Sequence, residues 1–550
     1  MSATTPEPSA APPAVAPATG GVQTVRRLIT YLLLFIMVVI AAIGLTGLLE
    51  RVLEFGGTLA YYGSDSLAQS LAFSLIAGPL AAVLWWLVWR ESAMARDRAS
   101  VAWPLYLTLT STVALLTFTI ALFGWANAFI RDEWQASSLA TAIVWGLIWV
   151  WHYWMWRHPA KGPTRLVGVA PAIASLIGLW MGLWGLISAL AVLIDAATAT
   201  FSGGVVFESP LWQSVLQALV WAVGGGLLWW WHWFRAGVRE LRTGFATVLL
   251  VLITGLGAFT VFVFGVTLTL YVVLRLIVTP DAPLGVILDP LGMAVATAAI
   301  GALALVYHTR VVAKHPDAVA KATGLVTSGV ALATVATGVG VTINALLAAL
   351  STPLVGSDFR PLLLGGISML VVGGVLWWAT WRPELASTPD RVATPGRRIY
   401  LVVIFGVSAL VALITLLVIG YQLFSFALDG ETGGSLLDRL RQALALLVAT
   451  VLVAVYHFAL WRRDRAVTAA DDVPRMIGRL TLVTSSDPAV LVGALREATG
   501  ARVSVLQRSD AVAGEPDAAA LLSAIDGVAA DHVLVIAGAK GKVEVIRLGS

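Results

Sequence analysis

Four histidines recur at one place in a repeated sequence pattern, and imidazole readily binds metal ions and haem iron. They are His152, His232, His308 and His457. In two other copies of the pattern the equivalent residue is Trp86 or Trp378, and tryptophan cannot ligate a metal. This alternation favours interfacial histidines that donate to a carbonyl or a lipid phosphate. We therefore expect no metal site and no cofactor, and no cofactor-binding residue can be named.

Sequence motifs of enzyme active sites are missing from the chain. There is no cysteine, which excludes disulfides, thiolate metal sites and a cysteine nucleophile. The phosphate-binding GxxxxGK[ST] loop, the metal-binding HExxH helix, the GxSxG nucleophile turn and the EF-hand loop are missing too. The sequence therefore identifies no catalytic residue, and we expect a protein that is not an enzyme.

Side chains that could line a path through a membrane are scarce. Ion-coupled transport uses ionisable residues inside the membrane, and none lies near the centre of a span predicted below. The uncharged polar residues considered within these spans are Asn127, Ser188, Gln217, Thr254 and Asn344. Asn344 is the most conspicuous of them, and we expect it to form a hydrogen bond between helices.

The four histidines belong to a short aromatic run that ends in arginine and occurs six times. The runs are WWLVWR (85–90), WHYWMWR (151–157), WHWFR (231–235), YHTR (307–310), WWATWR (377–382) and YHFALWR (456–462). Their closing arginines recur every 67 to 80 residues, and a period of this kind indicates tandem structural units. We call these runs exits, because each ends an apolar segment.

The exits have two interpretations. Tryptophan prefers the headgroup level of a bilayer and arginine prefers the phosphates, so the exits are predicted to be interfacial anchors. The alternative is an aromatic platform for a hydrophobic ligand or a partner helix. The one-sided distribution of tryptophan supports the alternative. Of the 23 tryptophans, 15 lie in or just before the exits, whereas an ordinary aromatic belt has tryptophan on both faces of the membrane.

The composition is that of a membrane protein. Hydrophobic residues make up 59% of the chain and charged residues 12%, whereas soluble domains carry about 25% charged residues. An apolar run of about 20 residues crosses a bilayer as a helix. The predicted spans are 28–50, 67–89, 102–126, 136–156, 167–194, 211–234, 245–275, 290–308, 323–350, 361–381, 399–425 and 439–461. They form six pairs, and the second helix of each pair ends in an exit.

Basic residues divide unequally between the two ends of these spans. The N-terminal segment, the loops after even-numbered spans and the stub after the last span hold 21 Lys and Arg, whereas the loops after odd-numbered spans hold six. Loops rich in Lys and Arg face the cytoplasm. We therefore predict a multi-pass protein of the cell (inner) membrane with both termini in the cytoplasm.

The C-terminal residues have the pattern of a small α/β domain. β-rich runs at 479–484, 501–507, 532–536 and 542–548 surround helical patterns at 488–499 and 517–528. This βαβαββ order predicts parallel pairing across both helical crossovers, with AGAKG at 537–541 as a hairpin turn. His532 has no evident partner. We interpret the domain as a docking or regulatory module.

The predicted organisation has four parts. They are a disordered Ala/Pro-rich tail at 1–25, a membrane domain at 26–465, a linker at 466–474 and the soluble α/β domain at 475–550. The predicted fold class is an all-α polytopic membrane domain of about twelve transmembrane helices in six two-helix repeats, plus a small C-terminal α/β cytoplasmic domain.

The repeating unit resembles a bacterial integral-membrane family known as domain of unknown function 5671. The resemblance is carried by RRLITYLLLF at 26–35, RRIYLVVIFG at 397–406 and the exits. It covers about 26–465 as tandem copies and leaves the C-terminal domain outside. The fourth exit departs most, because ALVYHTR at 304–310 lacks tryptophan. The resemblance implies a multi-pass membrane protein and brings no known activity.

Three functions remain open on these observations. The first is a non-enzymatic membrane scaffold or partner-binding protein, with the cytoplasmic domain as its docking point. The second is a transporter or channel for an apolar or weakly polar solute, with Asn344, Gln217 and Thr254 lining one cavity. The third is a membrane sensor that signals through the C-terminal domain. The expected partners are the lipid bilayer and a membrane or cytoplasmic protein, and no nucleic acid.

Overall fold

The computed structural model describes most of the chain. The described residues are 20–54, 64–91, 98, 100–202, 210–350, 359–385, 388–392, 394–429, 435–471, 477–485, 487–510 and 513–548. They belong to two compact units, Met1–Trp381 with Ala412–Ala449, and Arg382–Val411 with Thr450–Ser550. The predicted disordered tail lies outside the described residues up to residue 19, and the helix that follows begins at Gly20, eight residues before the first predicted span.

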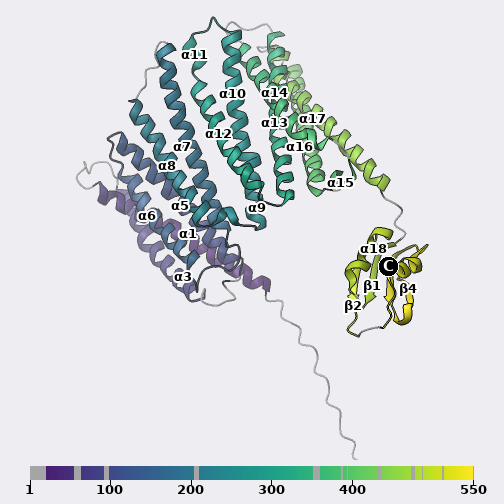
Figure 1. Ribbon diagram of the computed structural model, residues 1–550. Helices are drawn as coiled ribbons and strands as arrows, with labels where there is room; N and C mark the ends of the chain where they lie inside the picture. Colours follow the sequence, from purple (N-terminus) through teal and green to yellow (C-terminus); the bar gives the residue numbers. More distant parts are fainter. Residues whose placement is uncertain are drawn as a thin grey trace, which may run out of the picture. The chain divides into compact units, whose positions relative to one another are not determined.

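Helices build the first unit, and most of them are long and apolar (Figure 1). In chain order they are α1 (Gly20–Leu53), α2 (Ser64–Ala72), α3 (Gly78–Glu91), α5 (Ala102–Ile130), α6 (Ala136–Arg157), α7 (Val169–Ser202), α8 (Leu211–Trp230), α9 (Gly244–Val251), α10 (Phe259–Val278), α11 (Leu284–Leu288), α12 (Leu291–Val312), α13 (Asp317–Leu350) and α14 (Arg360–Trp381). Two more helices, α16 (Pro395–Asp429) and α17 (Leu436–Asp471), contribute residues to both units.

Among the described residues, eleven helices are long and apolar enough to cross a membrane. Each of them coincides with a predicted span. The helix α6 is not one of the eleven, although it is 22 residues long. Its second half carries tryptophan, tyrosine and histidine, which lower its mean hydropathy although these side chains suit a membrane interface.

Consecutive helices pack as antiparallel pairs, because short connections join them. The closest pairs are α5 with α6, α7 with α8, α10 with α12, and α13 with α14. Neighbouring pairs also touch, since α7 contacts α12 and α10 contacts α14, and Figure 1 shows these helices side by side.

Glycines permit this close packing. A Cβ atom on Gly373 of α14 would lie 2.5 Å from the backbone nitrogen of Val335 on α13. A Cβ on Gly301 of α12 would lie 2.6 Å from the nitrogen of Phe262 on α10. Small residues let helix backbones meet within a membrane, where dispersion forces drive association. These glycines therefore let the paired helices approach each other closely.

Short π-helical segments interrupt three of the helices. They are Phe73–Ala77 between α2 and α3, Trp231–Arg235 (η3) after α8, and Leu252–Ala258 between α9 and α10. A π-helical turn holds an extra residue and changes which side chains face the neighbouring helix. The segment η3 is itself the third exit.

A buried ion pair lies in the helical part of the second unit. The Arg397 side chain, at the start of α16, is 1% exposed. Its Nε lies 2.7 Å from Asp464 Oδ2 on α17 and its Nη2 lies 3.1 Å from Oδ1. Its Nη1 donates to the Glu384 carbonyl and lies 3.3 Å from the Glu384 carboxylate. This two-carboxylate site joins three segments of the unit.

The helix α17 is longer than its predicted span. It continues to Asp471, ten residues beyond 461, and therefore includes much of the predicted linker. The added residues are mostly alanine and arginine, which are strong helix formers. Extending an existing helix also avoids the cost of starting one. The rest of the predicted linker, 472–474, lies outside the described residues.

The C-terminal residues of the second unit form a four-stranded sheet. Its strands are β1 (Ile477–Thr484), β2 (Arg502–Gln507), β3 (Ala530–Ala537) and β4 (Val543–Leu548), with α18 (Pro488–Thr499) and α19 (Ala518–Ile525) between them. The strand order is β2-β1-β3-β4. The strand β1 pairs in parallel with β2 and β3, and β3 pairs antiparallel with β4. The parallel pairing predicted across the first crossover is present, between β1 and β2. The pairing predicted across the second crossover is wrong, because β1 lies between β2 and β3 and pairs with both.

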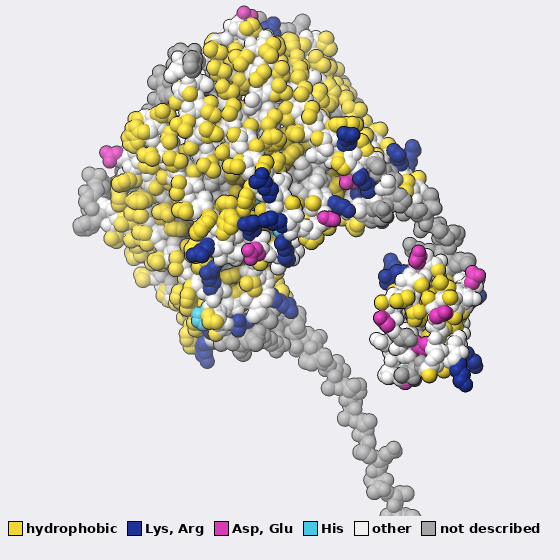
Figure 2. Space-filling model, viewed as in Figure 1, with side chains coloured by type: hydrophobic (Ala, Val, Ile, Leu, Met, Phe, Trp, Pro, Cys, Tyr) yellow, Lys and Arg dark blue, Asp and Glu magenta, His cyan; other side chains and the backbone are white. Residues whose placement is uncertain are grey.

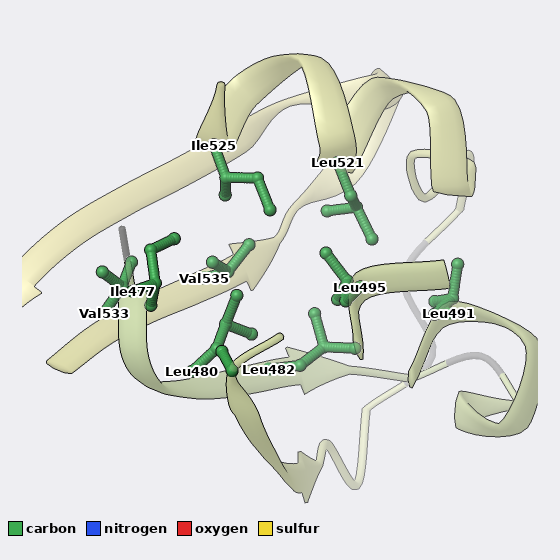
Figure 3. Packing of buried hydrophobic residues seen from close by; sticks show 10 residues of the cluster. Ile477, Leu480, Leu482, Leu491, Leu495, Leu521, Ile525, Val533 and Val535 are labelled. Carbon is green, nitrogen blue, oxygen red and sulfur yellow. The ribbon is translucent and has the colours of Figure 1, made fainter. Parts of the chain in front are cut away.

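Both helices cover the same face of this sheet. Figure 3 shows Leu491 and Leu495 of α18 and Leu521 of α19 against Leu480 and Val535 of the sheet. The helices begin at Asp487 and Asp517, whose carboxylates accept hydrogen bonds from free backbone amides of the first turn. The opposite face of the sheet carries neither helix, because both helices bury their apolar sides in the single core on the first face.

Candidate functional site at the aromatic exits

The four equivalent histidines share one hydrogen bond. In each, Nδ1 lies 2.8 or 2.9 Å from the carbonyl four residues earlier in its own helix, namely that of Ile148, Leu228, Ala304 or Val453. A carbonyl can only accept, so Nδ1 carries the proton and Nε2 of the neutral ring is an acceptor. The predicted donation to a carbonyl is therefore confirmed.

The first of these histidines has a second partner. The Tyr106 hydroxyl of α5 lies 3.0 Å from His152 Nε2, and both side chains are buried. Because Nε2 is the acceptor, the tyrosine donates. By contrast, His308 Nε2 is buried and has no hydrogen-bond partner within the described residues. In those residues no group of three or more His, Cys, Asp or Glu could hold a metal ion.

The exits of consecutive helix pairs contact one another. Trp89 of the first exit stacks on Trp154 of the second, with ring centroids 5.8 Å apart and an interplanar angle of 11°. Trp231 of the third exit donates from Nε1 to the Tyr153 hydroxyl of the second at 3.0 Å. These contacts run along the first three exits, and we call the joined rings the aromatic seam.

The seam continues into the fourth exit. Trp233 Nε1 donates to the Tyr307 hydroxyl at 2.7 Å, and the Trp233 and His308 rings lie 5.8 Å apart in an edge arrangement. Several exit rings therefore contact the exit of a neighbouring helix pair. Sequence reasoning missed these contacts, because the tyrosine comes after the histidine in the second exit and before it in the fourth.

Closing arginines stack on aromatic rings of their own helix. The Arg90 guanidinium lies 4.8 Å from the Trp86 ring and that of Arg157 lies 4.7 Å from the Tyr153 ring. Each ring is four residues earlier, one helical turn away, which places the two side chains on the same face. Stacking of this kind keeps the cation at a defined height beside the ring.

The loop after the second exit is held against the seam. The Trp103 indole nitrogen donates to the Lys161 carbonyl at 2.9 Å. The Lys161 ammonium donates to the Trp89 carbonyl and lies 4.5 Å from the Trp89 ring centroid. Burial lowers the pKa of Lys161. This loop thus connects the first exit to the second.

A cavity of about 430 Å³ lies between the second and third exits. Its lining residues are Ser111, Thr112, Leu115, Trp149, Tyr153, Trp156, Arg157, Val167, Ala170, Pro171, Ala174, His232 and Ala236. They come from α5, α6, the start of α7 and the third exit with the residue after it. The cavity combines an aromatic wall with one cation, one imidazole and hydroxyl groups, so it can bind a ligand that has both polar and apolar parts.

The polar residues singled out within the spans have separate partners. Arg441 of α17 donates from Nη1 to Asn344 Oδ1 of α13 at 3.4 Å, so the predicted bond between helices is confirmed. Thr254 donates to Leu250 of its own helix at 2.8 Å. When the Asn127 side-chain amide is oriented so that both its oxygen and its nitrogen form hydrogen bonds, the nitrogen donates to the Gln217 backbone carbonyl at 3.2 Å. The contacts of Asn344 and Asn127 join separate helices, whereas that of Thr254 stays within one helix. They do not assemble Asn344, Gln217 and Thr254 into one site.

The uncovered face of the C-terminal sheet carries a second group of polar residues. Arg479 of β1 is in register with Arg502 of β2 and His532 of β3. One row further, Thr481 Oγ1 lies 3.0 Å from His532 Nε2 and 3.1 Å from Ser504 Oγ. His532 therefore has a partner that the sequence did not reveal, because only the strand register brings residues 481 and 532 together.

A model of the family described as domain of unknown function (DUF5671) matches the chain three times. The matched residues are 27–136, 169–313 and 317–452. The first region contains α1 to α5, the second α7 to α12, and the third α13 to the first half of α17. Together the matches cover well over half of the chain. No curated protein and no solved structure matches it.

Proposed function

This chain belongs to the DUF5671 family as three tandem copies, and we propose that it is a non-enzymatic membrane scaffold that binds a protein partner through its C-terminal sheet. The proposal rests on the arrangement of side chains rather than on the family, whose description states no function. Two features support it, namely the joined exits and the uncovered sheet face.

The proposed topology has twelve spans in six hairpins, with both termini in the cytoplasm. The second and third family matches each contain four membrane-length segments, whereas the first contains three and ends where α6 begins. Counting α6 with the first copy would give it four as well. The unequal loop charge supports the orientation. Figure 2 shows hydrophobic side chains over most of the visible face of the helices, with most Lys and Arg gathered toward the end where α3 and α9 lie in Figure 1.

The joined exits suit a static scaffold. A transporter must move its helices against each other to open its site to either side. Here rings of the first four exits stack and hydrogen-bond across helix pairs at one end of the helices. Aromatic pairs add about 0.5–1.5 kcal/mol each beyond the area they bury. A seam of this kind opposes sliding between adjacent pairs.

The uncovered sheet face is the observation that carries the docking proposal. Two arginines lie side by side in register on β1 and β2, and neither has an ion-pair partner among the described residues. Like charges directly opposite each other destabilise a sheet. An acidic segment of a partner protein would remove that repulsion. It could also contact half-buried Val483 and Ile536, which lie further along the same face, beyond the row of Thr481.

The test is capture of partners from native membranes with the tagged full chain. The double variant Arg479→Gln/Arg502→Gln should reduce recovery of a stoichiometric partner at least about tenfold, because each lost contact to a charged group weakens binding severalfold. Recovery should also fall with ionic strength. The matched control is Arg547→Gln, an exposed arginine of β4 whose register partner is the core residue Val533. Equal recovery by the double variant and the control would overturn the docking role.

A further inference from the structure

The cavity between the second and third exits has the size of a small-molecule site. Its volume of about 430 Å³ falls within the range of about 300–1,000 Å³ that is usual for ligand pockets. It lies wholly within the first unit, and its walls come from four segments that the aromatic seam holds in place. One wall is the π-helical segment η3, and segments of this kind often occur at functional sites.

One part of the cavity is polar and positively charged. Arg157 contributes a guanidinium that stacks on the Tyr153 ring and has no acidic partner among the described residues. His232 contributes a buried imidazole whose Nδ1 is already bound to Leu228. Its Nε2 remains available to accept a hydrogen bond from a ligand hydroxyl.

A buried hydroxyl in the lining lacks a partner. Ser111 is only 9% exposed, and its Oγ makes no hydrogen bond within the described residues. A buried polar group without a partner costs folding free energy, so such groups usually face an ion, a water or a ligand. Here the unsatisfied hydroxyl lines the same cavity as Arg157 and His232.

The remaining walls are apolar and held in position. Trp149 stacks on Tyr153 with ring centroids 5.5 Å apart, and Trp156 donates from Nε1 to the Val167 carbonyl at 3.2 Å. Both rings therefore have fixed orientations. Leu115 and Ala174 complete this side, and both are buried. An acyl chain or another apolar group can replace empty space here with van der Waals contact.

We propose that this cavity binds one anionic amphiphile, a molecule with a phosphate or carboxylate head and an apolar tail. Arg157 binds the anionic group of the head, Ser111 donates a hydrogen bond to it, and His232 Nε2 accepts one from a hydroxyl of the head. Leu115, Ala174 and the tryptophan rings contact the tail. The position suits a membrane lipid, because tryptophan and arginine occupy the headgroup level. This site goes beyond the scaffold function and does not depend on it.

The binding test uses the full chain, purified in a non-ionic detergent and stripped of lipid. Phosphatidylglycerol, phosphatidylcholine and inorganic phosphate are titrated separately, and native mass spectrometry counts bound molecules while tryptophan fluorescence reports the affinity. We expect one phosphatidylglycerol per chain, bound at least about tenfold more tightly than phosphatidylcholine, because phosphatidylglycerol alone carries a net negative charge and hydrogen bonds to charged groups are the stronger ones. Equal binding of the two lipids would overturn the proposal. So would competition by inorganic phosphate that matches the lipid, because the ligand would then be a soluble anion.

Variants locate the binding within the molecule. Arg157→Gln should weaken phosphatidylglycerol binding about tenfold, and it should fold because Arg157 is exposed. Ala174→Leu should abolish binding by filling the cavity. The matched control is Arg90→Gln, which removes an arginine stacked in the same way on Trp86 but outside the cavity lining. A loss of affinity in the Arg90 variant equal to that in the Arg157 variant would show binding by general interfacial charge and would refute the site.

Discussion

At the scale of residues, groups that could do chemistry bind other parts of the protein. In all four equivalent histidines, Nδ1 donates a hydrogen bond to a carbonyl of the same helix. The nearest approach to a relay is the buried pair of Tyr106 and His152. Sequence reasoning found the histidines by their repeat position, but the tyrosine partner lies on another helix and gave no signal.

The hydrogen bond between Tyr106 and His152 predicts that substitutions at these two positions have non-additive effects on the free energy of unfolding. His152→Phe should lower the free energy of unfolding by about 1–3 kcal/mol, because it leaves the buried Tyr106 hydroxyl without an acceptor. Tyr106→Phe in the same chain should then cost little more. The double-mutant cycle can be measured by SDS-induced unfolding in mixed micelles. His308→Phe is the control and should cost less, because His308 Nε2 has no partner to strand. Additive single effects would contradict the pairing.

A second residue-scale prediction concerns the buried ion pair of the second unit. Asp464→Asn should destabilise the protein by about 1–3 kcal/mol, because Arg397 keeps Glu384 but loses the charged partner of its Nε and Nη2. The measurement is the shift in melting temperature of the detergent-solubilised chain. Glu133→Gln is the control, since the Arg131–Glu133 pair is exposed and such pairs are worth about 0–1 kcal/mol. A similar shift in both variants would contradict this reasoning.

At the scale of elements, helix pairs depend on close backbone contact. Gly373→Ala should destabilise the α13–α14 pair by about 1–3 kcal/mol, because the new methyl would lie 2.5 Å from the Val335 nitrogen and force the helices apart. Gly365→Ala in the same helix meets nothing within 4 Å and should be neutral or stabilising by up to about 1 kcal/mol. Melting curves of the two variants measure this difference in stability. A larger destabilisation by Gly365→Ala than by Gly373→Ala would show that α13 and α14 are not packed through Gly373.

The elements of the C-terminal domain show what strand patterns can predict. All four strands and both helices lie within a few residues of their predicted positions, because alternation of apolar residues and turn glycines are local signals. The positive φ of Lys540 and Gly541 agrees with the predicted hairpin turn. Which side chains share the uncovered face, by contrast, follows from the register between strands.

At the scale of the whole molecule, the helix α6 decides the topology. If α6 crosses the membrane, the loop before it and the loop after it lie on opposite sides. Because the chain contains no cysteine, Glu133→Cys and Arg165→Cys are single reactive sites in exposed positions. We expect an impermeant maleimide to label Glu133→Cys in intact cells, and Arg165→Cys only after permeabilisation. Asp281→Cys, in the loop after α10, is the control for the outer side. Labelling of both test sites from one side would reduce the number of spans to eleven.

The sequence alone determined the helices, their approximate ends and the strands, because length, hydropathy and periodicity are properties of contiguous residues. It also located the exits and the family resemblance, since both recur along the chain. Only the tertiary structure decided what these residues contact. Trp231 meets Tyr153 across 78 positions, and Arg157 and His232 share one cavity. Such contacts depend on the packing angle and helical phase of separate helices, and no local pattern of residues encodes either quantity.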